Sequence, residues 1–286
     1  MPTSSRPPTV ALGQPTTGDA ELAAVAEVFA SGWLSGAGPA CRRFEERFAA
    51  TTGTAAALAT SNCGAALHLA MTVLGAGAGD EVVVADYTFP ATGHAVAWTG
   101  ATPVFADVRP DIWTVDPAAA TAAIGPRTVG IIAVDSFGHP ADYAELRAVA
   151  DRHGLWLLED AACAAGAEYR GRPAGSLADL ATFSFHGRKG ITAGEGGALV
   201  SDRGDLIEHA RKLHTYGIAP ALARSDTDLV LPEFDETGYN YRLSDVAAAI
   251  MGVQLDRLPD LLAARRHVAA GYAQLLGGLE QVRLPI

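Results

Sequence analysis

The alternation of short apolar segments with amphipathic stretches restricts the fold of this chain more than any other feature of its sequence. The apolar segments end near Asp, Gly or Pro, and residues with helical spacing follow them. This pattern is typical of β and α elements wound into a mainly parallel sheet. The candidate strands are Glu81–Ala85, Pro103–Val108, Val129–Val134, Leu155–Leu158, Ala181–Phe185 and Ala198–Val200.

The segments between and after these strands predict helices. Ala141–Arg152 and Asp205–His214 repeat apolar residues at helical spacing, and the basic end of the second suits the helix dipole. The polar, proline-containing stretch Gly217–Thr237 predicts a long loop. Beyond it, Ser244–Leu258 predicts a helix with its serine as N-cap, and Pro259–Leu276 predicts another. The sequence therefore predicts an α/β fold.

Length and composition narrow the possible partners. With 286 residues, of which 49% are hydrophobic, the chain is long enough for one large domain and part of a second. The opening MPTSSRPPTVALGQPTTG has no apolar leader, and no later run is long enough for a membrane span, so we expect a cytoplasmic protein. A net charge of −11, without a cluster of Lys and Arg, argues against a nucleic-acid partner.

The sequence indicates neither a disulfide framework nor a metal site. Cys41, Cys63 and Cys163 are an odd number of cysteines without CxxC spacing, so we expect reduced thiols. None of the eight histidines stands in an HExxH or similar pattern, and we expect no bound metal. His68, inside a predicted helix, is expected to be packed or solvated rather than catalytic.

A carboxylate and a lysine stand at the ends of two predicted strands. The run LWLLED brings Asp160 to the carboxyl end of its strand, where open α/β sheets place ligand sites; a solvated loop acid or a helix cap fits the same position. Lys189 follows the next buried strand, in a glycine-rich segment beside Arg188. Desolvation or a cationic neighbour frees a lysine amine for Schiff-base chemistry. The alternative is an ordinary surface lysine, with Arg188 turned into solvent.

Two further features suit a phosphate group and a planar ring. Small polar residues precede the helix in Thr60–Leu74, and unpaired backbone N–H groups at such a helix start bind anions, although capping alone explains Asn62. Phe89 follows a strand, where it either lies against a planar ring or packs in the core. A phosphate site, a stacking ring, a carboxylate and a lysine are together the groups that pyridoxal 5′-phosphate (PLP) requires from a protein.

Several sequence blocks connect these residues. They begin at SGWLSGAGPACRRFEERFA and continue through DYTFPAT, FGHPADYAELRAVADRHGL, LLEDAACAAGAEYRGRPAGSLADLATFSFHGRK, GEGG and GYNYRLSDVAAAIMGVQLDRL. In these blocks the chain resembles the DegT/DnrJ/StrS-type sugar aminotransferases, which are PLP enzymes of fold type I. The resemblance covers nearly the whole chain, and the EDAA, FSFHxxK, GEGG and GYNYR blocks together are highly specific. It implies a fold-type I large domain with a mainly parallel, seven-stranded sheet.

Carried over residue by residue, the resemblance implies two catalytic residues. Lys189 would be the Schiff-base lysine, and Asp160 would be the partner of the pyridine nitrogen. Phe89 would stack on the ring, backbone groups near Cys63 and a serine hydroxyl would bind the phosphate, and an asparagine would reach that phosphate from the other subunit of a homodimer. The cofactor-binding residues that the resemblance implies, besides the two catalytic ones, are Cys63, Gly64, Phe89, Cys163, Ser184 and Asn240.

Two positions depart from the commonest pattern of this family. Cys63-Gly64 stands where the phosphate loop usually reads Gly-Thr, which lowers the expected affinity for PLP unless backbone N–H groups suffice. Cys163 stands where a Gln is common, which puts one ring contact in question. The lysine at position 189 indicates transamination, since relatives that dehydrate sugars have histidine there.

Members of this family continue beyond QVRLPI into a smaller C-terminal domain. The resemblance therefore predicts an N-terminal arm at 1–18, a PLP-binding large domain at 19–240 and the truncated start of the small domain at 241–286. On this prediction the helix Ser244–Leu258 would expose apolar surface, and transfer to keto-sugars would be weak.

We therefore expect a PLP-dependent aminotransferase of antibiotic or polysaccharide biosynthesis. It would move an amino group from glutamate or glutamine to a keto group of a nucleotide-linked deoxysugar or a related cyclic ketone. The alternatives are a truncated or regulatory subunit that binds PLP without turnover, and a nucleotide-binding α/β protein without PLP. The visible absorbance of lysine-bound PLP, and its response to an amino donor, would separate the three.

Overall fold

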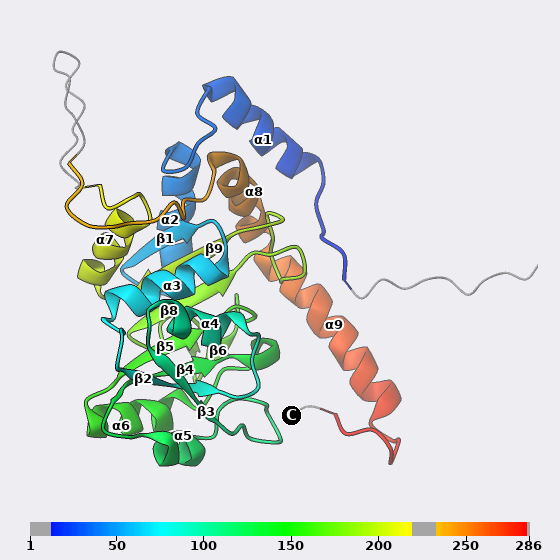
Figure 1. The fold of residues 1–286 in the computed structure, drawn as a ribbon. Coiled ribbons are helices and arrows are strands. Elements are labelled where there is room, and N and C mark those ends of the chain that lie inside the picture. Colours follow the sequence, from blue (N-terminus) through cyan, green and yellow to red (C-terminus); the bar gives the residue numbers. More distant parts are fainter. Residues whose placement is uncertain (1–12, 219–232, 285–286) are drawn as a thin grey trace, which may run out of the picture.

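The computed structural model describes residues 13–218 and 233–284. These residues form a seven-stranded sheet in the order β1-β9-β8-β5-β4-β2-β3. Helices pack on both of its faces (Figure 1). β9 runs antiparallel to both of its neighbours, and the remaining pairings of this sheet are parallel. The predicted α/β fold with a mainly parallel sheet is confirmed.

The helices and strands have the following bounds. The strands of the large sheet are β1 (Ala56–Thr60), β2 (Glu81–Ala85), β3 (Thr102–Ala106), β4 (Thr128–Val134), β5 (Trp156–Asp160), β8 (Leu180–Ser184) and β9 (Gly197–Ser201), and a small hairpin pairs β6 (Glu168–Tyr169) with β7 (Arg172–Pro173). The helices are α1 (Asp19–Ser31), α2 (Pro39–Thr52), α3 (Cys63–Val73), α4 (Ala91–Trp98), α5 (Pro117–Ala123), the short η1 (Ser136–Gly138), α6 (Tyr143–His153), α7 (Gly204–Leu213), α8 (Asp245–Asp256) and α9 (Leu258–Leu276).

Each predicted strand is present, with its ends shifted by at most two residues. Strand β1 was not predicted, because its sequence AALAT is rich in alanine, which favours helices and is depleted in strands. It becomes a strand by pairing along its whole length with β9. This pairing depends on residues far away in the sequence, so no local pattern could reveal it.

The predicted helices are also present. Ser244 caps α8 as expected, because its hydroxyl oxygen accepts a hydrogen bond from the N–H of Ala247 at 3.2 Å. Of the predicted loop Gly217–Thr237, residues 219–232 lie outside the described part of the chain. One flank of the loop contacts α7, since Glu236 binds both His209 at 2.9 Å and Lys212 at 3.1 Å.

Successive side chains of the strands point to opposite faces of the sheet, where they pack against different helices. Val82 and Val84 belong to the apolar cluster under α3, α4 and α7, whereas Val83 and Ala85 belong to the cluster under α5 and α6. Near β1, β8 and β9, the face that carries α5 and α6 is covered by α2 and α8, where Phe183 packs against Phe48. The sheet is therefore buried on both faces, and its strand ends are where ligands can reach it.

The expectation of an exposed apolar surface on Ser244–Leu258 is wrong. Ala248, Met251 and Leu255 of α8 are buried in the cluster that also contains residues of α2. Large exposed apolar side chains occur on α9 instead, at Val268, Tyr272 and Leu275, where the helix extends away from the sheet (Figure 1). The division at 18 and 240 into arm, large domain and small domain stays a prediction.

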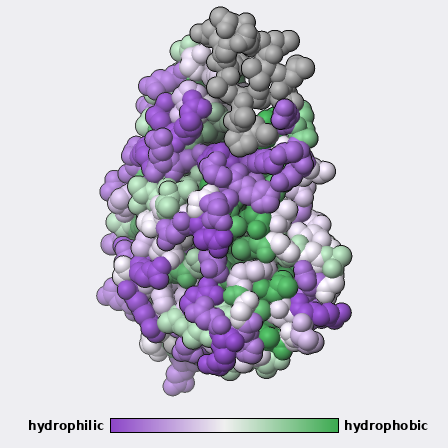
Figure 2. Space-filling model, turned by 90° about the vertical axis from the view of Figure 1, so that its left-hand side faces the viewer, coloured by the Kyte–Doolittle hydropathy of each residue, from purple (hydrophilic) through white to green (hydrophobic). Residues whose placement is uncertain are grey.

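The described helices include none that could span a membrane. None of those in residues 13–218 and 233–284 combines the length and the apolar character needed to cross a bilayer. The face shown in Figure 2 is mostly hydrophilic, with smaller hydrophobic patches across its middle.

Candidate active site

The predicted site residues meet in a cavity at the carboxyl ends of β5 and β8. The cavity has a volume of about 400 Å³, and its lining contains every predicted site residue except Asn240. These residues come from the start of α3, the turn before α4, the end of β5 and the region after β8. They are Cys63, Gly64, Phe89, Asp160, Cys163, Ser184 and Lys189.

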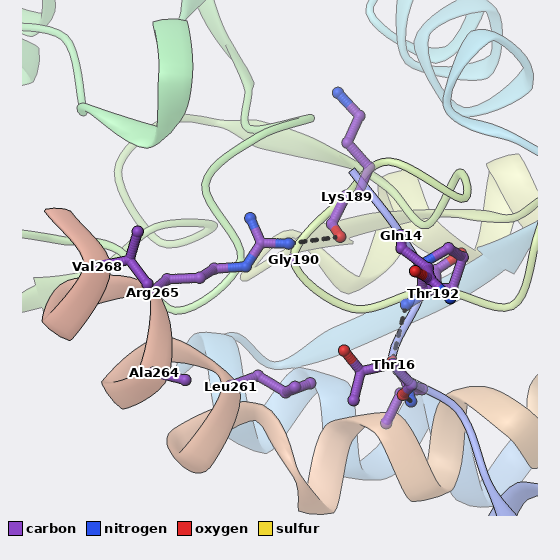
Figure 3. Close-up of a pocket in the computed structure, with 11 residues that line it drawn as sticks. Gln14, Thr16, Lys189, Gly190, Thr192, Leu261, Ala264, Arg265 and Val268 are labelled. Carbon is purple, nitrogen blue, oxygen red and sulfur yellow. Dashed lines mark hydrogen bonds between the residues drawn. The ribbon is translucent and has the colours of Figure 1, made fainter. Parts of the chain in front are cut away.

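Lys189 directs its amine towards this cavity. Its Nζ donates a hydrogen bond to Sγ of Cys163 at 3.0 Å, while its carbonyl oxygen accepts one from Nη2 of Arg265 on α9 at 3.2 Å. Figure 3 shows a second pocket, of about 280 Å³, on the other side of the loop that carries Lys189. This pocket is also lined by residues of α8, α9 and the segment 14–16. The side chain of Lys189 points away from that second pocket, which therefore meets only its backbone.

Asp160 is the last residue of β5 and is buried, with 4% of its surface exposed. Its Oδ2 accepts a hydrogen bond from the hydroxyl of Thr92 at 2.8 Å, and its Oδ1 accepts one from the N–H of Ala162 at 3.2 Å. Burial raises the pKa of Asp160, against the lowering effects of these donors and of the Lys189 charge. The alternative of a solvated loop acid is wrong. A cation in the cavity would favour the ionised form of this carboxyl group.

The start of α3 forms one end of the cavity. Asn62 caps the helix, because its Oδ1 accepts a hydrogen bond from the N–H of Ala65 at 2.8 Å. Gly197 of β9 approaches this helix start so closely that a Cβ atom would lie 2.5 Å from the carbonyl carbon of Asn62 and 2.6 Å from the nitrogen of Cys63. Glycine is therefore required there. The first N–H groups of α3, at Cys63 and Gly64, have no carbonyl partner within the helix and suit an anion.

Phe89 lies in front of the cavity with 75% of its surface exposed. The alternative of core packing is therefore wrong for this residue. It also lines an adjoining cavity of about 320 Å³, together with Asp160, Cys163 and Lys189. Its ring is free to lie against a flat ligand between the two cavities.

The two cysteines of the cavity differ in their surroundings. Burial raises the pKa of Cys63 well above its usual value, so this thiol stays protonated at neutral pH. Cys163 is exposed and is the hydrogen-bond acceptor of the lysine amine. Within residues 13–218 and 233–284, no group of three or more His, Cys, Asp or Glu side chains could hold a metal ion.

Asn240 does not line the cavity of its own chain. It is exposed and pairs through its backbone with Thr215. The tyrosines on either side of it stack on each other with ring centroids 4.9 Å apart, and the hydroxyl of Tyr241 lies 3.0 Å from Nδ1 of His68. His68 is 8% exposed, which confirms that it is packed. The GYNYR block is thus anchored to α3, with Asn240 facing outward.

The sequence patterns did not reveal Thr92 as the partner of Asp160. Thr92 lies in the first turn of α4 and is 1% exposed, and its hydroxyl also lies 2.8 Å from that of Thr88. Both threonines stand in the DYTFPAT block, so the block itself was the available signal. Its contact with Asp160 joins residues separated by two strands in the chain, and no local spacing indicates it.

The family comparison covers nearly the whole chain. Residues 15–286 match the family described as the DegT/DnrJ/EryC1/StrS aminotransferase family. The GDP-perosamine synthase of Caulobacter vibrioides is 39% identical over 272 residues, which are 95% of this chain and 71% of that protein.

Solved structures show the same fold. The aminotransferase TlmJ from Streptoalloteichus hindustanus matches with a TM-score of 0.90 and 38% identity, over 97% of this chain and 74% of TlmJ. DesI, solved in the presence of its TDP-sugar product, matches with a TM-score of 0.85 and 39% identity, over 94% of this chain and 66% of DesI.

Proposed function

The chain belongs to the DegT/DnrJ/EryC1/StrS family of PLP-dependent sugar aminotransferases, and we propose that it aminates a keto group of a nucleotide-linked deoxysugar or a related cyclic ketone. Glutamate or glutamine would donate the amino group. The observation that carries this proposal is the cavity that gathers Lys189, Asp160, Phe89 and the start of α3. A nucleotide-linked acceptor is supported by two relatives, one named GDP-perosamine synthase and one solved with its TDP-sugar product.

The residues of the cavity fit PLP. The first N–H groups of α3 suit a phosphate group, and Ser184 at the end of β8 adds a hydroxyl to the same cavity. The buried carboxyl group of Asp160 suits a protonated ring nitrogen. When bound, PLP would carry the migrating amino group and take up the electron pair released at the neighbouring carbon.

The protein residues would then have separate tasks. Lys189 would hold the cofactor covalently through Nζ and, once released, would move a proton at that same atom. Asp160 would keep the proton on the ring nitrogen, and Thr92 would hold the carboxylate in place through the bond to Oδ2. Phe89 would cover one face of the ring. The nearby Cys163 would take the place of a side-chain amide beside the lysine.

The donor and acceptor can be tested by single-turnover spectroscopy. The protein loaded with PLP is expected to absorb visible light, to lose that absorbance with glutamate or glutamine, and to regain it with a suitable acceptor. A panel of keto-sugar nucleotides and cyclitol ketones would identify the acceptor. If a donor bleaches the absorbance but no acceptor of either class restores it, the proposed substrate class is wrong. Loading without any response to donors would favour a PLP-binding subunit without turnover.

We further propose a homodimer with shared active sites, in the cytoplasm. This proposal is supported by the resemblance of the GYNYR block and by the outward position of Asn240, whose side chain is exposed in the single chain. The contact of Tyr241 with His68 would hold the backbone of the neighbouring Asn240 in place. Its partner would be the phosphate held in the other subunit's cavity.

Subunit complementation would test this sharing. Lys189→Ala and Asn240→Ala homodimers are each expected to be impaired. In a mixed dimer, one of the two sites contains both substituted residues and the other contains neither, so one competent site should return. Transfer rates would be measured before and after subunit exchange, with exchange verified by mass. An absence of recovery after complete exchange, with Asn240→Ala alone clearly impaired, would count against shared sites.

A further inference from the structure

Two buried carboxyl groups lie behind Asp160, and the proposed reaction uses neither of them. Asp135 follows β4 directly and is 1% exposed, and Glu159 of β5 is 0% exposed. β4 and β5 are neighbours, with Ala133 opposite Glu159 and Val134 opposite Asp160. The backbone N–H of Asp135 donates to the carbonyl oxygen of Asp160 at 3.0 Å. Glu159 is thus the chain neighbour of Asp160, and Asp135 is tied to Asp160 by a backbone hydrogen bond.

Three of the four carboxyl oxygens in this pair have donors. Oε1 of Glu159 accepts from the N–H of Gly175 at 2.7 Å, and Oε2 accepts from that of Leu177 at 3.2 Å. Oδ1 of Asp135 accepts from the hydroxyl of Tyr143 at 2.8 Å and from the N–H of Ala141 at 3.1 Å.

Oδ2 of Asp135 is the oxygen without a partner. It is fully buried and has no hydrogen-bond donor in the described part of the chain. Glu159 points to the same face of the sheet as Asp135, because Tyr143, which bonds Asp135, and Leu177, which bonds Glu159, belong to the same buried cluster under α5 and α6. An unpaired, buried carboxylate oxygen is costly. A proton on one of the two carboxyl groups would supply the missing bond.

The electrostatics of the pair agree with one shared proton. Two neighbouring buried carboxylates cannot both ionise without a large penalty. Burial, and then the charge of Glu159, raise the pKa of Asp135 well above its usual value, and burial raises that of Glu159 to about 7. Other ionisable groups near the pair are Tyr143 on α6, Arg172 on β7, Asp160 on β5 and Lys189, which lines the adjoining cavity with Asp135. Arg172 and Lys189 are the cations among them, and the charge of Arg172 lowers the pKa of Glu159.

We propose that Asp135 and Glu159 share one proton, and that this proton makes them positioning residues for Asp160 and for the turn that carries Phe137. The turn is η1, in which Phe137 has a left-handed backbone with φ of 57°. Asp135 and Phe137 line the adjoining cavity of about 320 Å³ together with Asp160 and Lys189. By bonding Asp135 to Glu159, the shared proton would fix the ends of β4 and β5 and the turn η1 relative to one another.

Asp135→Asn tests the shared proton, because asparagine keeps Oδ1 as acceptor and places an N–H donor where Oδ2 stands. The folded pKa values of the pair are raised, so the proton stabilises the fold fully at pH values below the ordinary carboxyl range, and this contribution is lost as pH rises towards about 7. Between pH 5 and 8, the Tm of the parent should therefore fall by several degrees relative to that of Asp135→Asn. A Tm difference that stays constant across this range would overturn the shared proton.

Matched variants separate this effect from general damage. Asp205→Asn removes an exposed carboxylate paired with Arg203 at 2.7 Å and should leave the Tm difference from the parent flat between pH 5 and 8. Glu159→Gln also supplies a permanent donor to Asp135, and should show the same pH response as Asp135→Asn at a lower overall Tm, because it gives up one acceptor for Gly175 or Leu177.

PLP affinity tests the positioning role, and this part rests on the proposed function. Asp135→Ala, measured at pH 6 by absorbance titration, should bind PLP about tenfold more weakly than the parent, as expected for about one lost buried hydrogen bond, and Asp135→Asn should restore the affinity. An alanine variant with the parent's affinity would overturn the positioning role. If the parent itself bound no PLP, the proposed function would fail, while the Tm comparison would still decide whether the proton is shared.

Discussion

Replacing Lys189 with alanine is expected to abolish both the visible absorbance of the PLP-loaded protein and all amino transfer. The chain has one other lysine, Lys212 on α7. Its amine binds Asp235 at 2.7 Å and Glu236 at 3.1 Å and does not line the cavity. No second lysine is therefore placed to attach the cofactor or to move the proton. Proton transfer alone contributes about 10²–10⁴-fold, and the covalent attachment of the cofactor is lost as well, so no transfer should remain detectable.

The matched control for this variant is Lys212→Ala. It removes an amine of the same kind and its ion pairs with two acids whose side chains are 58% and 38% exposed. It should keep the visible absorbance and the transfer rate of the parent, because ion pairs near the surface contribute little to stability. Absorbance spectra and single-turnover rates with glutamate would compare the two variants. Transfer by Lys189→Ala at a rate near that of the parent would show that the assignment of the lysine is wrong.

Replacing Asp160 with asparagine is expected to leave PLP bound but to lower the rate of transfer. The expected loss is about 10²–10⁴-fold, the range typical for the loss of a catalytic acid or base group. An amide is neutral and cannot keep the ring nitrogen protonated in this buried place. The substitution also disturbs the bonds that Thr92 and Ala162 donate to the carboxylate. Binding would be measured by absorbance titration and turnover by the rate of keto-acid release.

Thr92→Val separates the charge of Asp160 from its hydrogen bond. Valine has nearly the shape of threonine and leaves the carboxylate ionisable, but it cannot donate to Oδ2. The expected loss of rate is about tenfold, in keeping with one hydrogen bond to a charged group. Unchanged turnover in Asp160→Asn would remove this residue from the proposed mechanism, and equal losses in the two variants would mean that the bond, rather than the charge, matters.

The sequence alone determined the type of fold and the chemical groups of the site. The apolar runs that predicted β2, β4, β5, β8 and β9 are local, since a strand buried on both faces is largely apolar. The blocks LLED and FSFHxxK then placed Asp160 and Lys189 at strand ends, and the cavity brings these two residues together as expected. Their roles with PLP stay predictions, as does that of Asn240.

Only the tertiary structure decided which partners these groups have. The alanine-rich β1 is a strand because β9 lies beside it, Phe89 is exposed because it lies at a cavity rather than in the core, and Asp160 meets Thr92 from a helix two strands earlier in the chain. Asp135 and Glu159 come to the same part of the sheet because β4 and β5 are neighbours in the sheet order. Strand order, burial and hydrogen-bond partners depend on contacts between distant segments, and local sequence patterns carry no information about those contacts.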